Sequence, residues 1–457
     1  MPMTFDVRNR NVTVVGAGRS GGPAAELLVR RGARVTLADT AATIAHEAEL
    51  SSIGVRLELG PHRADQFVGA DLVVLSPGVD PAQSAIAAAR TAGVPVIGEV
   101  ELASRWLQGR VIAITGTKGK STTTTLTSLM LRAGGFDAPA GGNLGTALSS
   151  QVAASTPSTI HVVEVSSFQL ETTDTFHPWI SVFVNLSPDH LDRHASFEAY
   201  RAAKARIFAR QTPQDWAVIN ADDAGARDVA PAGAGAPQRL DYTFDSTIAN
   251  GVTVEGGTIV RRVNGVSTPL VPLTAVQVPG RHILSDVLAA SAVASLVGVP
   301  AEAMTRAVAN FQGLEHALQR VAVVGGVQFI NDSKATNVAA ATRAIESFGD
   351  GLVVILGGKY KGGDFGALAA PLRERRAAVV AIGEARPLIH AALDEAVPVH
   401  DADSMEDAVR KAARATTSGG TVLLAPACSS FDMFRDYTER GRAFVAAVQK
   451  WEGTTAM

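Results

Sequence analysis

The 457-residue chain has only one cysteine, Cys428, and its aromatic residues amount to 5%. A single cysteine excludes an intramolecular disulfide and any metal site built from several cysteines, and it fits a reducing compartment. Neither sign of charge dominates, because 41 Lys and Arg stand against 44 Asp and Glu, a formal net charge of -3. No overall field therefore draws the protein to nucleic acid, and any phosphate ligand must be held by local groups.

Long apolar runs are also missing. Charged residues, glycine or proline interrupt every apolar stretch before it reaches the length of a membrane span. The opening MPMTFDVRNRNVTVVGAG has no long apolar run behind its charges, so it predicts neither a signal peptide nor an anchor. We expect a cytoplasmic protein that does not bind membranes.

The length and the pattern of apolar runs predict three α/β domains. A chain of 457 residues exceeds what one hydrophobic core normally holds. Strand-like runs alternate with Ala-rich helical stretches, which is typical of parallel sheets covered by helices. We place the domains at 1–107, 108–310 and 311–457. The predicted strands are 11–15, 34–38, 71–75, 110–114, 160–165, 180–185, 327–330, 352–356, 378–382 and 421–424, and the main predicted helices are 24–30, 196–210 and 282–296.

A phosphate-binding loop is predicted at TGTKGKS, residues 115–121, between a strand and a helix. Glycines let the backbone approach a phosphate closely, and the amides and dipole at a helix start favour an anion. Lys120 would reach the β- and γ-phosphates of a nucleotide, and the Ser121 hydroxyl would ligate Mg²⁺. The common pattern G-x-x-x-x-G-K-[ST] has a glycine where Ile114 stands, so a glycine-rich turn with an exposed lysine is the alternative.

Lys204 lies on the apolar stripe of a predicted helix, SFEAYRAAKARIFAR (196–210), between Tyr200 and Phe208. The usual interpretation of such a lysine is that its stem packs on the protein and its ammonium reaches water. If the amine is buried instead, its pKa falls and it becomes nucleophilic. Such an amine can react with CO₂ to give a carbamate, a hard ligand for Mg²⁺. The sequence alone leaves both interpretations open.

Acidic and histidine residues follow two further predicted strands. Glu164 lies at the end of HVVEV, and Asp189 and His190 come after SVFVN. Ligands gather at the carboxyl ends of parallel strands, so these groups would share a crevice with the phosphate loop. They suit Mg²⁺ or Mn²⁺. For each residue alone, a helix cap or a loop charge is an equally good explanation.

A glycine turn, GAGRSG (16–21), follows the first predicted strand and matches G-x-G-x-x-G. Asp39 ends the next strand, where a ribose-binding acid belongs. Taken alone, this pattern indicates dinucleotide binding, but the same turn and helix can bind any diphosphate or serve only as a turn. A simple dehydrogenase would not need a second phosphate loop further along the chain.

Seven motifs together resemble one family, the Mur ligases, over essentially the whole chain. NDSKATN combined with DHLDRH is similar to the members that add D-glutamate. The resemblance implies an ATP-dependent ligase that joins D-glutamate to UDP-N-acetylmuramoyl-L-alanine through an acyl phosphate, in peptidoglycan precursor synthesis. The motifs are GTKGKST (116–122), GGNLG (141–145), EVSSFQLE (164–171), NLSPDHLDRH (185–194), YRAAKARIF (200–208), NDSKATN (331–337) and PACSSFDMF (426–434).

The resemblance also implies a fold and residue roles. The first domain would be Rossmann-like and hold UDP rather than NAD, the second a P-loop-type mononucleotide-binding ATPase domain, and the third a Rossmann-like α/β domain for D-glutamate. ATP contacts fall on Gly116, Thr117, Lys118, Gly119, Lys120, Ser121, Thr122, Asp286 and Asp332. Contacts to the UDP-linked substrate or D-glutamate fall on Arg19, Ser20, Asp39, Thr40, Asn143, Lys334, Thr336, Lys361, Ser430 and Tyr437. Two Mg²⁺ ions, or Mn²⁺, would be held by Ser121, Glu164, His190 and a carbamylated Lys204, and Lys120, Lys204 and His190 would be catalytic. We expect a monomer.

Several positions depart from the family pattern. Lys118 replaces a common Asn, Ala317 stands where an Arg near ATP is frequent, and Ile283 and Asp286 replace Asn residues near the adenine. Arg320 is a candidate substitute for the missing Arg. These changes affect details of ATP placement. The alternatives in function are a sister ligase or folylpolyglutamate synthase, an NAD-dependent oxidoreductase, and a nucleotide-binding regulator without catalysis.

Overall fold

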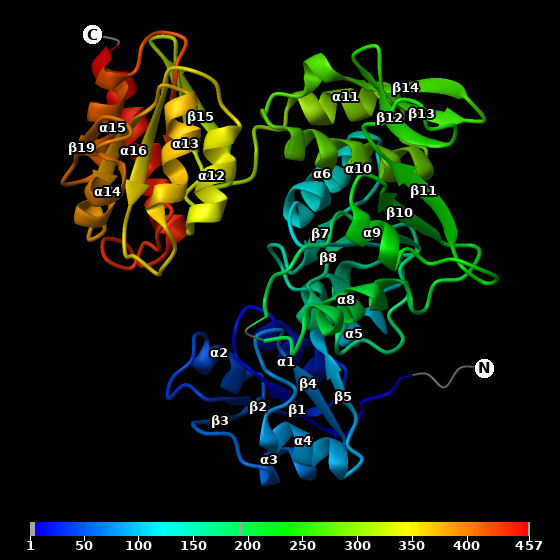
Figure 1. Cartoon of the computed structure of the whole chain (residues 1–457). Helices are drawn as coiled ribbons and strands as arrows, with labels where there is room; N and C mark the ends of the chain where they lie inside the picture. Colours follow the sequence, from blue (N-terminus) through cyan, green and yellow to red (C-terminus); the bar gives the residue numbers. More distant parts are fainter. Residues whose placement is uncertain (1–4, 192, 456–457) are drawn as a thin grey trace. The chain divides into compact units, whose positions relative to one another are not determined.

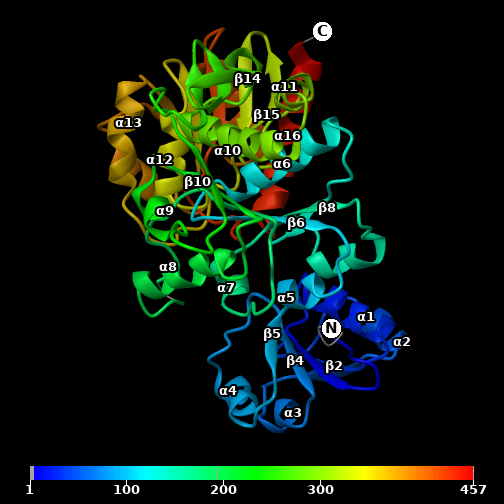
Figure 2. The same cartoon turned by 90° about the vertical axis from the view of Figure 1, so that its right-hand side faces the viewer.

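The computed structural model describes residues 5–191 and 193–455, so Asp192 of the DHLDRH motif lies outside the described residues. The chain forms two compact units (Figures 1 and 2). The first takes in Met1–Ala275 and Ser285–Ala309, and the second Val276–Leu284 and Asn310–Met457. The first unit contains two sheets and the second contains one.

The first sheet has five parallel strands in the order β3-β2-β1-β4-β5. The strand order reverses at β1, and the glycine turn 16–21 follows β1 at this switch point, where α/β sheets usually bind ligands. The strands are β1 (Asn11–Val15), β2 (Arg34–Asp39), β3 (Arg56–Leu59), β4 (Leu72–Leu75) and β5 (Val96–Gly98). The helices are α1 (Gly21–Arg30), α2 (Glu47–Ser52), α3 (Asp65–Val68), α4 (Ser84–Thr91) and α5 (Glu99–Ser104).

The second sheet has nine strands in the order β14-β13-β12-β11-β10-β9-β6-β8-β7, parallel from β7 to β12 and antiparallel from β12 to β14. The strands are β6 (Arg110–Thr115), β7 (Ala140–Gly142), β8 (Ile160–Glu164), β9 (Ile180–Phe183), β10 (Trp216–Asn220), β11 (Gln238–Tyr242), β12 (Gly251–Glu255), β13 (Thr258–Val263) and β14 (Val266–Pro272). The helices are α6 (Lys120–Ala133), α7 (Ser167–Leu170), α8 (Phe197–Ala205), α9 (Ala224–Val229), α10 (Arg281–Val297) and α11 (Ala301–Ala309), with 3₁₀ turns η1 (Leu148–Ala154), η2 (Arg206–Phe208) and η3 (Leu273–Ala275).

The third sheet has six strands in the order β15-β16-β20-β17-β18-β19, all parallel except the antiparallel edge strand β15. The strands are β15 (Gln319–Val324), β16 (Val327–Asn331), β17 (Leu352–Gly357), β18 (Ala378–Ile382), β19 (Val399–Asp401) and β20 (Thr421–Leu424). The helices are α12 (Val338–Glu346), α13 (Ala369–Glu374), α14 (Arg386–Leu393), α15 (Met405–Ala415) and α16 (Tyr437–Thr455), with a 3₁₀ turn η4 (Phe365–Leu368).

All ten predicted strands are present, with ends that shift by at most two residues. The predicted helix 196–210 is shorter than expected, because the α-helix α8 ends at Ala205 and continues as the 3₁₀ turn η2. Among the described residues, no helix is long and apolar enough to cross a membrane.

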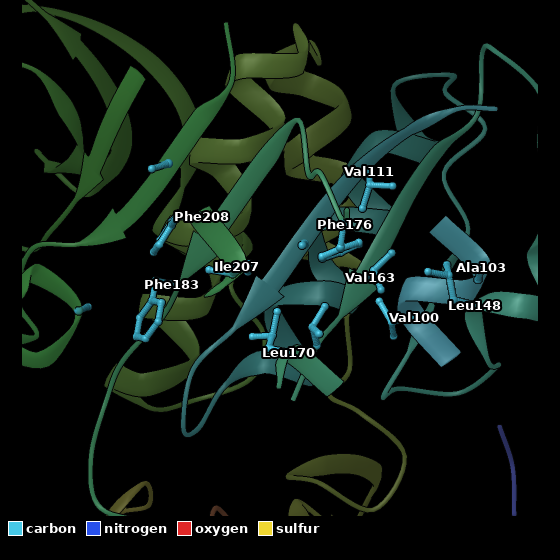
Figure 3. Packing of buried hydrophobic residues seen from close by; sticks show 14 of the residues in the cluster. Val100, Ala103, Val111, Leu148, Val163, Leu170, Phe176, Phe183, Ile207 and Phe208 are labelled. Carbon is cyan, nitrogen blue, oxygen red and sulfur yellow. The ribbon is translucent and has the colours of Figure 1, made fainter. Parts of the chain in front are cut away.

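Helix α5 is shared by the cores of the first two sheets. Val100 and Ala103 pack in the core of the second sheet together with Leu148 and Phe176 (Figure 3), whereas Leu102 packs in the core of the first sheet. Apolar burial on both sides of one short helix joins the two sheets through packed side chains as well as through the chain itself.

Candidate active site

The loop 116–119 between β6 and α6 adopts a conformation that needs glycine at two positions. The φ angle is +152° at Gly116 and +83° at Gly119, which is the N-cap of α6. A Cβ on Gly116 would lie 2.3 Å from the Cγ2 atom of Val184, and one on Gly119 would lie 2.3 Å from Oδ1 of Asp286. The loop therefore excludes side chains at both positions and packs closely against Val184 and Asp286.

Asn185, which follows β9, holds this loop in shape. Its Oδ1 accepts hydrogen bonds from the amides of Thr117 at 3.1 Å and Lys118 at 2.9 Å, and its Nδ2 donates to the carbonyl oxygen of Lys118 at 3.0 Å. At the start of α6, the amide of Thr123 donates to Gly119 O at 2.9 Å. Helix geometry directs the preceding amides out of the helix start, where the helix dipole also favours an anion. An anion at this loop would therefore meet the amides at the start of α6.

The two loop lysines have different partners, one within the loop and one outside it. Lys120 Nζ donates to Thr117 O at 3.0 Å, and Lys118 Nζ pairs with Asp189 Oδ2 at 3.1 Å. Burial tends to raise the pKa of Asp189, but its hydrogen bond and charge interaction with Lys118 outweigh burial and lower the pKa. Asp189 therefore stays ionised and adds negative charge next to the positive loop.

Glu164 ends β8, the strand next to β6, and its side chain is 1% exposed. Its Oε1 accepts a hydrogen bond from Asn143 Nδ2 at 2.6 Å, whereas its Oε2 is buried without a hydrogen-bond partner. An unpartnered buried carboxylate oxygen is costly, so proteins normally satisfy it with a donor, a water or a cation. This oxygen fits a role as a ligand to Mg²⁺.

Lys204 is buried rather than directed to solvent. Its residue is 2% exposed, and Nζ donates to Gly116 O at 2.7 Å, so the interpretation with the ammonium in water is wrong. Burial and the nearby charge of Lys120 lower its pKa to about 6, against the attraction of Asp189 and Glu164. The amine is therefore largely neutral and nucleophilic near pH 7.5.

His190 is exposed and packs in a cluster of aromatic rings with Phe168 and His194, which was not predicted. Its ring meets Phe168 edge-on, with centroids 5.0 Å apart, and Phe168 stacks on His194 at 5.3 Å. The buried His194 is fixed by Ser167 Oγ, 3.0 Å from its Nε2, and by Glu171 Oε1, 3.1 Å from its Nδ1. In the described part of the chain, no three His, Cys, Asp or Glu residues are grouped to hold a metal. A cation here would need ligands beyond the protein carboxylates and imidazoles, such as phosphates and water, which suits Mg²⁺.

Asp286 contacts the phosphate loop from the protein interior. Its Oδ1 accepts a hydrogen bond from Thr123 Oγ1 at 3.0 Å, and the same oxygen faces Gly119. Burial raises the pKa of Asp286 well above its ordinary value, against the bond from Thr123. Asp286 therefore supports the first turn of α6 through the hydrogen bond from Thr123.

A cavity of about 420 Å³ lies between the first sheet and the second. Five of the predicted substrate residues line it, namely Arg19, Ser20, Asp39, Thr40 and Asn143. Asp39 also holds the glycine turn, since its Oδ2 accepts from Ala17 N at 2.6 Å and its Oδ1 from Ala41 N at 2.8 Å. Four further polar residues that were not predicted also line the cavity, namely His62, Ser76, Gln83 and Gln169.

In the second unit, the buried Arg440 connects two of the motifs. It donates to Ser333 O at 2.8 Å and to Cys428 O at 3.1 Å, which ties 331–337 to 426–434. Ala427 N also donates to Ala335 O at 2.9 Å. This role of Arg440 could not be predicted from the sequence, because Ser333 lies 107 residues away in the chain.

The residues expected to contact nucleotide or D-glutamate in this unit differ in exposure. Burial raises the pKa of Asp332 to about 7, against a hydrogen bond from the amide of Leu318. Lys334 and Lys361 are exposed, Tyr437 is 37% exposed, and Ser430 is buried. Lys334 begins a tight turn in which the amide of Thr336 donates to Lys334 O at 2.8 Å, with the Thr336 side chain half-buried.

Comparison with known sequences shows which protein family the chain belongs to. Three family profiles match it: "Mur ligase MurD-like, N-terminal domain" over residues 10–98, "Mur ligase middle domain" over 114–294, and "Mur ligase, glutamate ligase domain" over 318–428. A UDP-N-acetylmuramoylalanine–D-glutamate ligase of Acidobacterium capsulatum is 44% identical over 99% of both chains, and one of Koribacter versatilis is 41% identical over 98% of both. The chain belongs to the Mur ligase family.

Solved structures of other Mur ligases share the fold. UDP-N-acetylmuramate–alanine ligase MurC of Thermotoga maritima superposes with a TM-score of 0.59 at 19% identity, over 97% of this chain and 100% of that one. The MurF ligase of the same organism, in complex with ADP, gives 0.59 at 15% identity, over 99% and 97%. The predicted family and the predicted fold class of three α/β domains are both confirmed.

The conformation of Gly119 allows a test of the phosphate loop in this Mur ligase. A Gly119→Ala substitution should raise the KM for ATP more than about tenfold, because the new Cβ collides with the buried Asp286 and shifts the loop. Gly135→Ala is the matched control, since Gly135 also has a positive φ of +90° but nothing within 4 Å of an added Cβ. ATP-dependent phosphate release measures both. Equal KM values for the two variants would contradict the role given to Gly119.

Proposed function

We propose that this Mur ligase joins D-glutamate to UDP-N-acetylmuramoyl-L-alanine and converts ATP to ADP and phosphate, in the cytoplasmic synthesis of peptidoglycan precursors. The full-length match to ligases named for this reaction carries the proposal. The site chemistry agrees with it, because a phosphate loop, an unpartnered carboxylate oxygen and a neutral lysine lie together at the strand ends of the central sheet.

The reaction needs ATP because a carboxylate resists attack by an amine. A carboxylate oxygen of the alanyl group attacks the γ-phosphorus and ADP leaves, which gives an acyl phosphate. The amine of D-glutamate then attacks the carbonyl carbon, loses a proton, and phosphate departs from the tetrahedral intermediate. The protein contributes alignment and charge neutralisation, with Lys120 and the start of α6 facing the phosphates.

Mg²⁺ would neutralise phosphate charge when bound at this site. Ser121, Glu164, His190 and a carbamylated Lys204 are the proposed ligands, for two ions, with Mn²⁺ as an alternative. The unpartnered Oε2 of Glu164 and the buried neutral amine of Lys204 support this set. A carbamate would replace the amine by two oxygens and a negative charge.

The remaining assignments extend this proposal. UDP would occupy the cavity lined by Arg19, Ser20, Asp39, Thr40 and Asn143. ATP would contact Gly116 to Thr122, Asp286 and Asp332, and D-glutamate would contact Lys334, Thr336, Lys361, Ser430 and Tyr437. We propose domains at 1–107, 108–310 and 311–457 in a monomeric protein.

Phosphate release against a panel of substrates tests the reaction. We expect release with ATP only when UDP-N-acetylmuramoyl-L-alanine and D-glutamate are both present, and none in a Lys120→Ala variant, which loses the phosphate contact. Equal turnover with L-lysine or meso-diaminopimelate would instead indicate a sister ligase. An absorbance change with a nicotinamide cofactor would indicate an oxidoreductase.

The carbamate predicts a pH-dependent NMR signal. With ¹³C-labelled CO₂, the wild-type protein should give a carbamate carbon signal at pH 7 to 8 that disappears as pH falls below about 6, because protonation of Lys204 removes its nucleophilic lone pair. Lower pH supplies more CO₂ from bicarbonate, so a loss there reports the lysine. A signal that persists at pH 5 would contradict the assignment.

Substitution tests the same group. Lys204→Ala should abolish ligation, and a small carboxylate such as acetate should restore part of it by supplying the missing oxygens. Arg201→Ala, an exposed position on the same helix, is the control and should keep full activity. Unchanged activity of Lys204→Ala would remove the carbamate from the proposal.

A further inference from the structure

Helix α5 carries two glutamates that are buried against the central domain. Glu99 is 1% exposed and Glu101 is 0% exposed. Neither lies in the phosphate-loop site, and neither lines the cavity between the first two sheets. Charged side chains are rarely buried without a specific partner, so the contacts of these two carboxylates define what they do.

Glu101 binds one short segment of the central domain. Its two oxygens accept hydrogen bonds from three consecutive amides, those of Asp174 at 2.8 Å, Thr175 at 3.0 Å and Phe176 at 3.0 Å. Thr175 Oγ1 and Arg105 Nε donate as well, at 2.6 Å and 2.8 Å. Burial favours a raised pKa, but these donors outweigh it and lower the pKa of Glu101, so its charge is retained.

Glu99 binds a second segment. Its Oε1 accepts hydrogen bonds from the amide of Ser149, at 2.6 Å, and from the Ser149 hydroxyl. Its Oε2 is buried without a hydrogen-bond partner, and burial raises the pKa of Glu99 against the bonds from Ser149. Just before α5, the Gly98 amide donates to Thr172 O at 3.1 Å, and a Cβ on Gly98 would lie 2.2 Å from Thr172 Oγ1.

The two anchored segments lie a few residues after those that form the central-domain side of the cavity. That side consists of Gly142 and Asn143, which precede η1 and Ser149, and of Gln169, which precedes 174–176. The opposite side comes from the first sheet, from which α5 also continues. Two other polar contacts join the first domain to the central domain, an exposed hydrogen bond from Arg19 Nη2 to Asn143 O at 3.1 Å and an ion pair between Arg193 and Asp80 at 3.4 Å. Contacts of this kind near the surface contribute little to stability.

We propose that Glu99 and Glu101 are positioning residues for the nucleotide-linked substrate. They fix the segments that carry Asn143 and Gln169 relative to the first sheet, and so set the width of the cavity. The apolar contacts of Val100 and Ala103 in the central core reinforce the same attachment (Figure 3). The inference rests on the proposed function, in which this cavity binds the UDP-linked substrate. The phosphate loop has no residue in this attachment, so ATP binding should not depend on it.

The test is steady-state kinetics of four single variants in the full chain. Glu101→Ala and Glu99→Ala should raise the KM for UDP-N-acetylmuramoyl-L-alanine about tenfold, with kcat and the KM values for ATP and D-glutamate within about twofold. Glu99→Gln should keep the wild-type KM, because a neutral amide oxygen can still accept both bonds from Ser149. Glu101→Gln should fail to rescue, since its NH₂ group would face donors.

Glu26→Ala is the control, because Glu26 lies on α1, is half-exposed and pairs with Arg30 of its own helix. An unchanged KM for the UDP-linked substrate in Glu101→Ala would overturn the proposal. So would a fall in kcat with all KM values constant, which reports only fewer folded molecules, or a Glu99→Gln variant as impaired as Glu99→Ala. If Glu101→Ala does not fold, Glu101→Gln and Glu99→Ala carry the same comparison.

Turnover by the wild-type protein distinguishes a failure of this inference from a failure of the proposed function on which it rests. No phosphate release by the wild type with all three substrates would reject the proposed reaction. Normal wild-type turnover with unaltered variants would reject only the positioning role.

Discussion

The buried contact between Lys204 Nζ and Gly116 O, at 2.7 Å, is the interaction on which the site depends. It joins α8 to the phosphate loop and places an amine with a pKa of about 6 within electrostatic reach of Glu164. Strands β9, β6 and β8 are parallel neighbours, so these groups meet at the carboxyl ends of the strands. Ligands of parallel sheets usually bind at these ends. The protein thus keeps a neutral amine and an unpartnered carboxylate oxygen in a place where a well-packed apolar pair would be more stable.

The cavity between the first two sheets depends on other interactions, which set the spacing of its walls. Its walls come from separate sheets, and the exposed hydrogen bond between Arg19 and Asn143 is too weak to fix their spacing. The spacing is set behind the cavity, where α5 packs into two cores and its glutamates bind 174–176 and Ser149. Burial affects the two carboxyl groups in opposite ways. Five hydrogen-bond donors lower the pKa of Glu101, whereas burial raises the pKa of Glu99.

The sequence predicted what is encoded locally. The offsets of Gly116, Gly119 and Lys120 after an apolar run indicated the phosphate loop, and a 3.6-residue stripe put Lys204 on the apolar face of a helix. Strand β7 was not predicted because Ala140–Gly142 has no apolar pattern and is a strand only through its pairing with β8. The roles of Asn185 and Arg440 also escaped prediction, since each contacts partners distant in the chain. Whether Lys204 was buried depended on packing that no spacing rule encodes.

The most direct test of this account is the effect of Mg²⁺ on thermal unfolding of the wild type and of a Glu164→Gln variant, each with ATP. Glutamine keeps the bond to Asn143 but removes the charge. The account predicts that Mg²⁺ with ATP raises the wild-type unfolding temperature above the value with ATP alone. It predicts that Glu164→Gln loses this Mg²⁺-dependent rise while being at least as stable as the wild type without ligands. An equal Mg²⁺-dependent rise in both proteins would contradict it.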